Sequence, residues 1–449
     1  MGWLSIRSPG MEPGDLQHKP APSVLVFNPF AEAFIALGKA FTPVKHQALL
    51  AADLANLPQF LCGPGDIVLV PERPSNAFLE TLREAGFPPP QFAELKSGRI
   101  DIEAQIFQQK LGALRPWAWA PDSVDLLEPL FDRAEGGPGR FNERIRQLYS
   151  KAWSANFLRM CLAGTAHRQA WLCPEDEAGV IVDTAKAALE AADSIRSRGH
   201  HRVVVKEAHG LAGNNALRLW EPEIPPQQRQ WIARACVNGR ELVVERWQER
   251  ELDFSAQLEM GPDGLSLCGY TGLQTDLRGQ FQANWVEPGR DEQLLSKVAG
   301  LLGSSPEIAG QVAKFYSELF AMLEVELRHA GFTGPVSIDA FVYRTADGAR
   351  RLKPVVEINP RQTMGRLTFE LAKHADQKSC GVFRLLGRAQ IRESGFTDFP
   401  SFVRHLREHL PLRFEGEPRR IRQGALALND PSRAQACLAT FEVGSSPLP

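Results

Sequence analysis

Short apolar segments alternate with amphipathic ones in the first third of the chain. The segments "SVLVF" (23–27) and "DIVLVP" (66–71) have strand patterns, and each precedes a helical pattern, "PFAEAFIALGKAF" (29–41) and "SNAFLETLREAGF" (75–87). Repeated strand–helix units predict a parallel sheet covered by helices, which is an α/β architecture. No GxGxxG follows the first strand, so the pattern argues against a dinucleotide site there.

A patch rich in Gly and Pro, "RAEGGPGRF" (133–141), predicts the end of this first region. Residues 142–164 then have a helical pattern, in which Ser150 is placed to cap a new helix that begins at Lys151. The block 160–245 mixes helical and strand patterns, with helices expected at 183–199 and 225–239 and strands at 201–208, 216–220 and 241–247. This mixture predicts a small α+β module.

The next part of the chain is rich in strand patterns. Strands are expected at 253–260, 265–275, 334–344 and 351–360, and the Asp347-Gly348 pair between the last two indicates a hairpin. One long amphipathic helix is expected at 305–331. The tail from residue 376 has a helical pattern at 399–410 and strand patterns at 424–429 and 437–443.

The predicted hairpin carries two acids that face each other. With a side-chain period of two, Asp339 lies on one face of its strand, and Glu357 and Asn359 share a face of the other. Two carboxylates and an amide that converge form an oxygen-rich site suited to Mg²⁺. Strand-end acids that face solvent are the alternative for either acid alone. Pro354 fits this strand only if the strand lies at a sheet edge or Pro354 lies at its start.

Two further segments suggest nucleotide binding. In "VVVKEAHGLAGNN" (203–215) a strand delivers Lys206, and a glycine-containing turn follows, an arrangement that can bring backbone N–H groups and a cation to phosphate oxygens. In "LVVERWQERELDFSAQLEM" (242–260) the connection after Glu245 offers backbone groups to a base edge, with apolar cover from Trp247. Taken separately, a solvated lysine before a hairpin turn and an ordinary interdomain linker explain them as well.

In this order the segments resemble the ATP-grasp superfamily, over about residues 146–375. Its most specific element is "EINPR" (357–361), and the preceding β/α region looks like the domain that stands before an ATP-grasp module. The first 22 residues are rich in Pro and Gly and are expected to form a flexible arm. After it we expect an N-terminal parallel β/α domain (23–145), a mobile α+β lid (146–245), a β-rich catalytic part with the metal site (246–375) and an extension completing the fold (376–449).

The resemblance also implies roles for nucleotide-binding residues. Lys151 and Lys206 match the two lysines that bind ATP phosphates, and Gly210 and Gly213 match the loop over them. Glu245 and the backbone of Arg246, Trp247 and Gln248 match the adenine-binding hinge, and Asp253 falls near the ribose position. The loop "HGLAGNN" lacks the serine usual in the family.

At the reaction centre, Asp339, Glu357 and Asn359 match the ligands of Mg²⁺, for which Mn²⁺ is an alternative. Arg361 matches an arginine beside the transferred phosphoryl group, and Arg366 and Arg278 are further candidates to hold a substrate carboxylate or developing negative charge. Many relatives carry an arginine two residues before the first metal acid, where Ser337 stands here, so the oxyanion partner stays unassigned.

Composition narrows the class of protein. Hydrophobic residues are 43% and charged residues 23% of the 449, and the net charge of −2 gives no electrostatic case for a nucleic-acid or membrane partner. Seven cysteines without a close pair favour reduced thiols in a cytoplasmic protein. No apolar run approaches ~20 residues, the length of a membrane-spanning helix. A homodimer through the first or last domain is expected only from its general frequency.

We therefore expect an ATP-dependent ligase that joins a small-molecule carboxylate to an amine through an acyl phosphate, on amino acids or peptide-like substrates. Phosphoryl transfer needs positioning and charge neutralisation more than covalent help, which fits the lysines, the acids and Arg361. Two alternatives stay open. The same residues can activate a carboxylate for a different acceptor such as a thiol, or the fold can serve a nucleotide-binding protein without catalysis.

Overall fold

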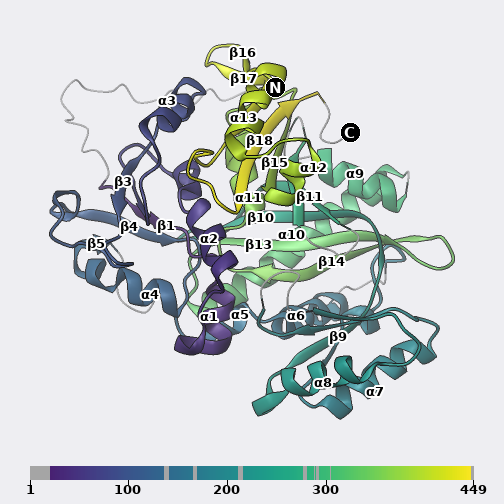
Figure 1. The fold of residues 1–449 in the computed structure, drawn as a ribbon. Helices are drawn as coiled ribbons and strands as arrows, with labels where there is room; N and C mark the ends of the chain where they lie inside the picture. The colour runs from purple at the N-terminus through teal and green to yellow at the C-terminus, as the bar shows by residue number, and fades with distance from the viewer. Residues whose placement is uncertain are drawn as a thin grey trace, which may run out of the picture.

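The computed structural model describes residues 21–135, 141–164, 169–210, 216–276, 281–287, 289, 293–303 and 305–445. Within these residues the chain forms a five-stranded, a four-stranded and a nine-stranded sheet (Figure 1). The predicted arm lies outside the described residues except for its last two positions, and so does most of the predicted boundary patch. None of the described helices combines the length and the apolar character that crossing a membrane requires.

The N-terminal domain is built on a parallel sheet, as the strand–helix alternation predicts. Its strands run in the order β3-β2-β1-β4-β5 and all pair in parallel. The strands are β1 (Val24–Val26), β2 (Ile67–Val70), β3 (Gln91–Glu94), β4 (Leu111–Pro116) and β5 (Ala134–Glu135). The helices are α1 (Ala31–Leu37), α2 (Lys45–Asp53), α3 (Asn76–Glu84) and α4 (Pro121–Leu127). β1 and β2 are fully buried, which explains their continuous apolar pattern.

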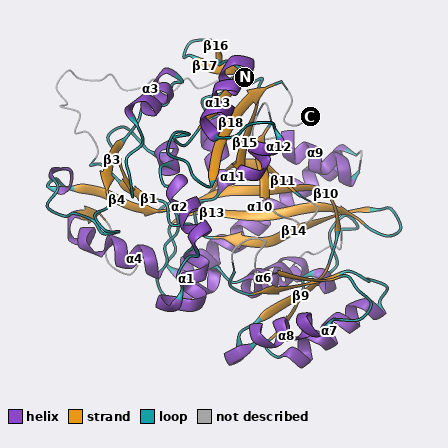
Figure 2. Ribbon diagram, in the orientation of Figure 1, coloured by secondary structure: helices purple, strands orange, loops and turns teal. Residues whose placement is uncertain are grey.

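A small α+β module follows, which we call the lid module (residues 180–246). Its antiparallel sheet has the order β6-β9-β7-β8, and α7 and α8 cover one face of it (Figure 2). The elements are β6 (Val180–Val182), α7 (Ala185–Ser197), β7 (Val203–Glu207), β8 (Ala216–Leu219), α8 (Pro226–Ala235) and β9 (Leu242–Arg246). Val203, Val205 and Val244 pack under the helices. Since side chains alternate, Lys206 and Glu245 point from the opposite face.

The nine-stranded antiparallel sheet joins the expected catalytic part and the C-terminal tail. Its order is β14-β13-β10-β11-β12-β15-β18-β17-β16. The strands are β10 (Glu249–Gly261), β11 (Gly264–Thr275), β12 (Phe281–Val286), β13 (Gly334–Arg344), β14 (Arg350–Asn359), β15 (Cys380–Gly387), β16 (Arg413–Glu415), β17 (Arg420–Ala427) and β18 (Cys437–Gly444). The tail thus contributes strands to the same sheet as the predicted hairpin.

Seven helices pack around this sheet. They are α5 (Glu143–Leu148), α6 (Lys151–Gly164), α9 (Gln293–Leu302), α10 (Pro306–Ala330), α11 (Met364–Ala372), α12 (Arg388–Glu393) and α13 (Phe399–His409). The predicted cap is confirmed, because the Ser150 hydroxyl accepts hydrogen bonds from the backbone N–H groups of Ala152 (3.2 Å) and Trp153 (3.4 Å). α6 therefore begins at Lys151 and presents this lysine at its first turn.

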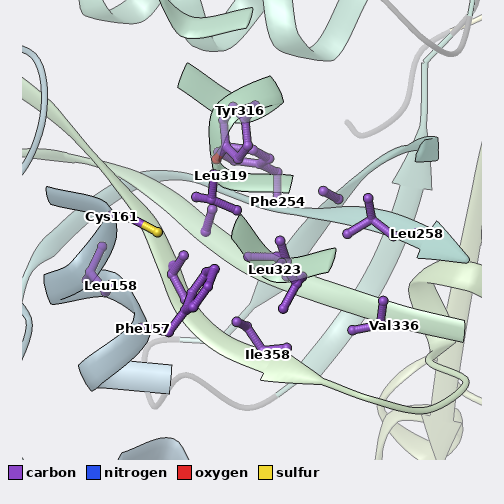
Figure 3. Close-up of a cluster of buried hydrophobic side chains, with 14 of the residues drawn as sticks. Phe157, Leu158, Cys161, Phe254, Leu258, Tyr316, Leu319, Leu323, Val336 and Ile358 are labelled. Atoms are coloured by element: carbon purple, nitrogen blue, oxygen red, sulfur yellow. The ribbon is translucent and has the colours of Figure 1, made fainter. Parts of the chain in front are cut away.

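The long helix α10 forms the centre of the largest core. Its apolar stripe includes Leu319 and Leu323, which lie against Phe254 of β10, Ile358 of β14 and Phe157 of α6 (Figure 3). The helix starts at a serine followed by proline and ends at Gly331, whose φ of 68° is the left-handed conformation that favours glycine. This core fixes the face of the sheet opposite to the polar residues of β13 and β14.

The two sides of α10 give a stability prediction. Leu323 is fully buried, whereas Val325, two residues later, is 50% exposed. Leu323→Ala removes apolar contacts and leaves a cavity. We therefore expect the free energy of unfolding, measured in urea, to fall by about 2–5 kcal/mol. Val325→Ala on the same helix should change it by less than ~0.5 kcal/mol. Equal effects of the two substitutions would contradict this placement of the core.

Candidate functional site

The hairpin of β13 and β14 places the predicted acids opposite each other. Asp339 pairs with Glu357 in the ladder, and Ser337 pairs with Asn359. The register shifts beyond Asp339, where β14 has two residues more than β13 around Pro354. Because β14 is the edge strand of the sheet, the missing N–H of Pro354 is tolerated there. The predicted approach of the two carboxylates is confirmed, and neither residue faces open solvent.

Asp339 lies in a buried, hydrogen-bonded position. Its Oδ1 accepts a hydrogen bond from the Ser255 hydroxyl of β10 (2.5 Å), and its Oδ2 accepts one from Nδ2 of Asn359 (3.2 Å). Burial, and after it the charge of Glu357, raise the pKa of Asp339 to about 6, against these two hydrogen bonds and the charge of Arg361. The carboxylate therefore costs free energy when it is ionised without a cation beside it.

Glu357 has the opposite electrostatic balance. The Lys151 ammonium lies 2.8 Å from its Oε1 and also donates a hydrogen bond to the carbonyl of Gly210 (2.9 Å). Burial would raise the pKa of Glu357, but the charge of Lys151 overcomes this effect and holds the pKa below its usual value. The charges of Arg361 and Lys206 act in the same direction. The structure thus brings the strand acids together with cations from an earlier part of the chain.

Lys206 lies beside the expected adenine-binding hinge. Its ammonium is 3.2 Å from Oε1 of Glu245, while Lys353 of β14 lies 2.9 Å from Oε2 of the same carboxylate. Burial works against the charge of Glu245, but the two lysines outweigh it and lower the pKa to about 2. Burial lowers the pKa of Lys206, in spite of Glu245. Lys353 is a member of this group that the sequence pattern does not single out.

The hinge residues surround a cavity of about 780 Å³, lined by parts of the lid module, β10, β11 and β13. The Trp247 ring lies between the guanidinium groups of Arg218 and Arg250, each 5.5 Å from its centre. Arg250 also forms an ion pair with Asp253 (3.0 Å) and lies 4.6 Å from the ring centre of Phe341. The backbone N–H of Trp247 donates to the backbone carbonyl of Arg202 (2.8 Å), so this backbone donor of the hinge already has a protein partner.

Sequence reasoning missed Glu177. This residue connects the two segments of the chain that link the lid module to the large sheet. Its carboxylate accepts hydrogen bonds from the side chains of Gln248 (2.6 Å) and Tyr343 (2.5 Å) and lies 2.8 Å from Arg246. Its backbone carbonyl accepts from Lys353 (2.9 Å). Glu177 is buried in the short helical segment before β6, and nothing in "CPEDEAG" (173–179) distinguishes it from its acidic neighbours.

The three candidate arginines have different surroundings. Arg361 donates from Nε to Glu32 (2.6 Å) and from Nη2 to Oδ1 of Asn359 (3.0 Å), so it lies beside the acids. Arg366 instead forms ion pairs with Glu259 and Glu370, both at 3.0 Å. Arg278 lies outside the described residues, as does Gly213 of the predicted loop.

A second cavity, of about 460 Å³, lies next to Arg361 at the junction of the N-terminal domain and the large sheet. Its wall includes Trp117, Trp119, Phe332 and Gln362. The side-chain oxygen of Gln362 is buried there without a hydrogen-bond partner among the described residues. The cavity follows the carboxyl end of β4, the edge at which open α/β sheets bind ligands.

The side chains that could hold a divalent cation are Asp339, Glu357 and Asn359. All three offer oxygen atoms, which suits Mg²⁺ or Mn²⁺. Among the described residues there is no group of three or more His, Cys, Asp or Glu with metal-site geometry. The role of the two acids and the amide as metal ligands stays a prediction.

Comparison with solved structures finds the same architecture over nearly the whole chain. The N5-carboxyaminoimidazole synthetase from Staphylococcus aureus aligns with 96% of this chain and 95% of its own, with a TM-score of 0.50 and 11% identity. The biotin carboxylase domain of the 2-oxoglutarate carboxylase from Hydrogenobacter thermophilus aligns with 96% of this chain and 87% of its own, with a TM-score of 0.49 and 12% identity. The amino-acid sequence matches no family model and no curated protein.

The likeness to the Staphylococcus aureus protein shows the fold. A parallel-sheet N-terminal domain precedes a large antiparallel sheet, with the lid module between them in the chain, and this is the ATP-grasp fold. The predicted fold class is confirmed. The residue roles within it stay predictions.

Asp339 and Glu357 lead to predictions of opposite sign for the stability of the protein. The raised pKa of Asp339 means that the folded protein binds more protons than the unfolded chain between about pH 4 and 6, so stability falls as pH rises through this range. In metal-free buffer, Asp339→Asn should therefore be ~1–3 kcal/mol more stable than the parent at pH 7.5, an advantage that vanishes near pH 4. The amide oxygen can accept from Nδ2 of Asn359, and the amide N–H can donate to the Ser255 hydroxyl oxygen, so both partners are retained with the second bond reversed.

The matched variant is Glu357→Gln. Since the pKa of Glu357 is lowered, its ionised form contributes stability above the unfolded pKa near 4, and that contribution is lost as pH falls below it. This variant should be less stable than the parent at pH 7.5. Urea unfolding across this pH range measures both variants, and a shift of the same sign in both would refute the assigned charge balance.

Glu177 gives a second prediction for this region. Glu177→Ala leaves Arg246, Gln248 and Tyr343 without their buried acceptor, so we expect a loss of about 3–5 kcal/mol in unfolding free energy. The exposed neighbour Glu175 is the control, and Glu175→Ala should change stability by less than ~0.5 kcal/mol. Thermal unfolding followed by circular dichroism compares the two, and a Glu177→Ala variant as stable as the control would remove Glu177 from this role.

Proposed function

We propose that this protein is an ATP-dependent ligase that joins a carboxylate to an amine through an acyl phosphate. The observation that supports this most is the convergence of Asp339, Glu357 and Asn359 with Lys151 and Arg361 in an ATP-grasp fold. Such a group neutralises the charge of a triphosphate and positions its terminal phosphorus for in-line transfer. The similar protein from Staphylococcus aureus is itself a synthetase by name.

In this proposal the nucleotide lies between the lid module and the face of the large sheet that carries the acids. Its phosphates meet Lys151 and Lys206, and Gly210 and Gly213 keep their predicted role in the phosphate-binding loop. Its base lies at the hinge, Glu245 to Gln248, and its ribose near Asp253. The cavity of about 780 Å³ at the hinge has the size of a nucleotide pocket. The two ion pairs that hold Glu245 keep the hinge in place.

Asp339, Glu357 and Asn359 would hold Mg²⁺, or Mn²⁺ in its place, as described above. The cation would neutralise oxygens of the β- and γ-phosphates and polarise the bond to the transferred group. A bound cation and Lys151 would both use the Glu357 carboxylate. With the cation at Glu357, the Lys151 ammonium would be free to turn toward a phosphate.

The reaction then has two balanced steps. A substrate carboxylate oxygen attacks the γ-phosphorus, the bond to the β-phosphate oxygen breaks, and an acyl phosphate and ADP result. An amine nitrogen attacks the acyl carbon, phosphate leaves with the bonding electron pair, and the amine gives up a proton. Arg361 lies where it can stabilise the negative charge of the transferred group. Exclusion of water by the lid module would protect the acyl phosphate from hydrolysis.

We place the acceptor in the cavity of about 460 Å³ beside Arg361. Its size suits an amino acid or a small peptide-like molecule. Trp117 and Trp119 provide flat apolar walls, and Gln362 is a polar residue of the lining. Arg366 is held by Glu259, which also lines this cavity, so we assign Arg366 to the support of the cavity wall. Arg278 stays a candidate for the substrate carboxylate.

The test is ADP release after mixing the protein with Mg-ATP and a panel of acids and amines. We expect release to rise at least tenfold only when a suitable acid and amine are both present, and Glu357→Gln to lower it by at least 100-fold because a buried acid is lost from the phosphate site. Glu318→Gln, a surface substitution on α10, is the control and should match the parent.

Two other outcomes of this assay would support a different function. Release that needs an acid and a thiol supports ligation to a different acceptor. Nucleotide binding without turnover across the whole panel supports a binding protein and contradicts the ligase proposal.

A further inference from the structure

One ion pair joins the first strand–helix unit of the chain to the reaction centre. Glu32, in the first turn of α1, lies 2.6 Å from Nε of Arg361, although 329 positions separate the two residues. Glu32 is only 4% exposed, and 20% of the Arg361 side chain is exposed. Burial works against the charge of Arg361, but Glu32 and then Glu357 outweigh it and raise its pKa. A buried carboxylate therefore faces the arginine from the N-terminal domain.

Counting the donors of Arg361 shows what this contact does. A guanidinium group has five N–H donors. Nε donates to Glu32, Nη2 donates to Asn359 (3.0 Å), and Nη1 donates to the backbone carbonyl of Gln362 (3.2 Å). One N–H on each terminal nitrogen is left, and the plane that carries both is fixed by the Glu32 contact at the third nitrogen. These two remaining donors can bind oxygens of a phosphoryl or carboxylate group.

The N-terminal domain holds the same segment at two further points. The Tyr149 hydroxyl lies 3.0 Å from both the Trp119 carbonyl and the Pro360 carbonyl, and the Gln362 N–H donates to the Trp117 carbonyl (2.8 Å). Residues 360–362 are thus tied to the loop after β4 on either side of Arg361. These backbone contacts place the segment, whereas Glu32 is the residue of the N-terminal domain that contacts the guanidinium group itself.

We propose that Glu32 is a positioning residue for phosphoryl transfer, through which the N-terminal domain orients Arg361 toward the transferred group. The proposal rests on the ligase function proposed above. Among the described residues, the contact that links Glu32 to the candidate site is the one to Arg361, so its effect on turnover would pass through Arg361. An interdomain ion pair with no part in turnover is the competing explanation, and it predicts an effect on stability alone.

The first experiment separates the rate of turnover from nucleotide binding. Glu32→Ala removes the contact, and we expect kcat for ADP formation to fall about 10–100-fold, as for other groups that orient a catalytic residue. The KM for ATP and the dissociation constant for ADP should stay within about threefold, because Glu32 is not at the nucleotide. Glu32→Gln keeps an oxygen that can accept from Nε, so it should restore kcat to within about fivefold of the parent.

The second experiment is a double-mutant cycle with Arg361→Lys. If Glu32 acts through Arg361, Glu32→Ala should lower kcat by less than threefold in the Arg361→Lys background. Glu324→Gln, which removes the carboxylate partner of Arg328 on the distant surface of α10, is the matched control and should leave kcat unchanged in both backgrounds. Multiplicative losses for Glu32 in the two backgrounds would overturn the proposal, as would unchanged kcat in Glu32→Ala.

The outcome is separable from the function proposal. Absence of acid- and amine-dependent ADP release in the parent protein refutes the ligase function. Turnover in the parent together with an unaffected Glu32→Ala variant refutes only the role of Glu32. Thermal unfolding of each variant checks the fold, and if Glu32→Ala is not folded at the assay temperature, Glu32→Gln and Glu32→Asp decide by their kcat at equal ADP affinity.

Discussion

The structure depends on the pairing of two carboxylates in one β-ladder and on the cations that this pairing demands. Asp339 and Glu357 are neighbours in the hairpin, and both are largely removed from water. Like charges in such a place are unfavourable unless cations or protons balance them. Lys151 balances one acid, and the raised pKa of Asp339 shows that the other is left unbalanced. A site with this imbalance has a built-in affinity for a further positive charge.

Single buried carboxylates also hold the parts of the molecule together. Glu245 joins the lid module to β14 through Lys353, Glu177 joins both connecting segments to β13, and Glu32 joins α1 to the segment after β14. Each of these contacts lies near the candidate site. The interfaces between the parts are therefore polar where a ligand would bind and apolar behind it, where α10 packs under the sheet.

Local pattern was sufficient for the hairpin, the cap and the lid module. The period of two along β13 and β14, together with the turn at Asp347-Gly348, indicates that Asp339 and Glu357 face each other, and the structure has them as direct partners. Ser150 is confirmed as the cap before Lys151 for the same local reason. Short segments such as β5 and β16 carry too few residues for a recognisable pattern.

The distant partners of Glu177 and Glu32 could not be predicted, because the sequence around each acid does not indicate them. Glu177 contacts Tyr343 across 166 positions, and Glu32 contacts Arg361 across 329. Acids occur throughout the chain, and these two are among the few described ones that the fold buries. Arg366, a further candidate to hold a substrate carboxylate or developing negative charge, lies in the first turn of α11, where its guanidinium group forms ion pairs with Glu370 and Glu259.

The position of β14 at the sheet edge has a consequence for the solubility of the protein. An open edge strand invites pairing with a strand from another molecule and so promotes aggregation. Here the Leu352 N–H donates to Trp171, Pro354 has no N–H to offer, and the Ile358 N–H donates to the Ser154 hydroxyl. The proline that is unfavourable inside a strand thus helps to close the edge that carries the acids, and the outer rim of this sheet is a poor template for fibril growth.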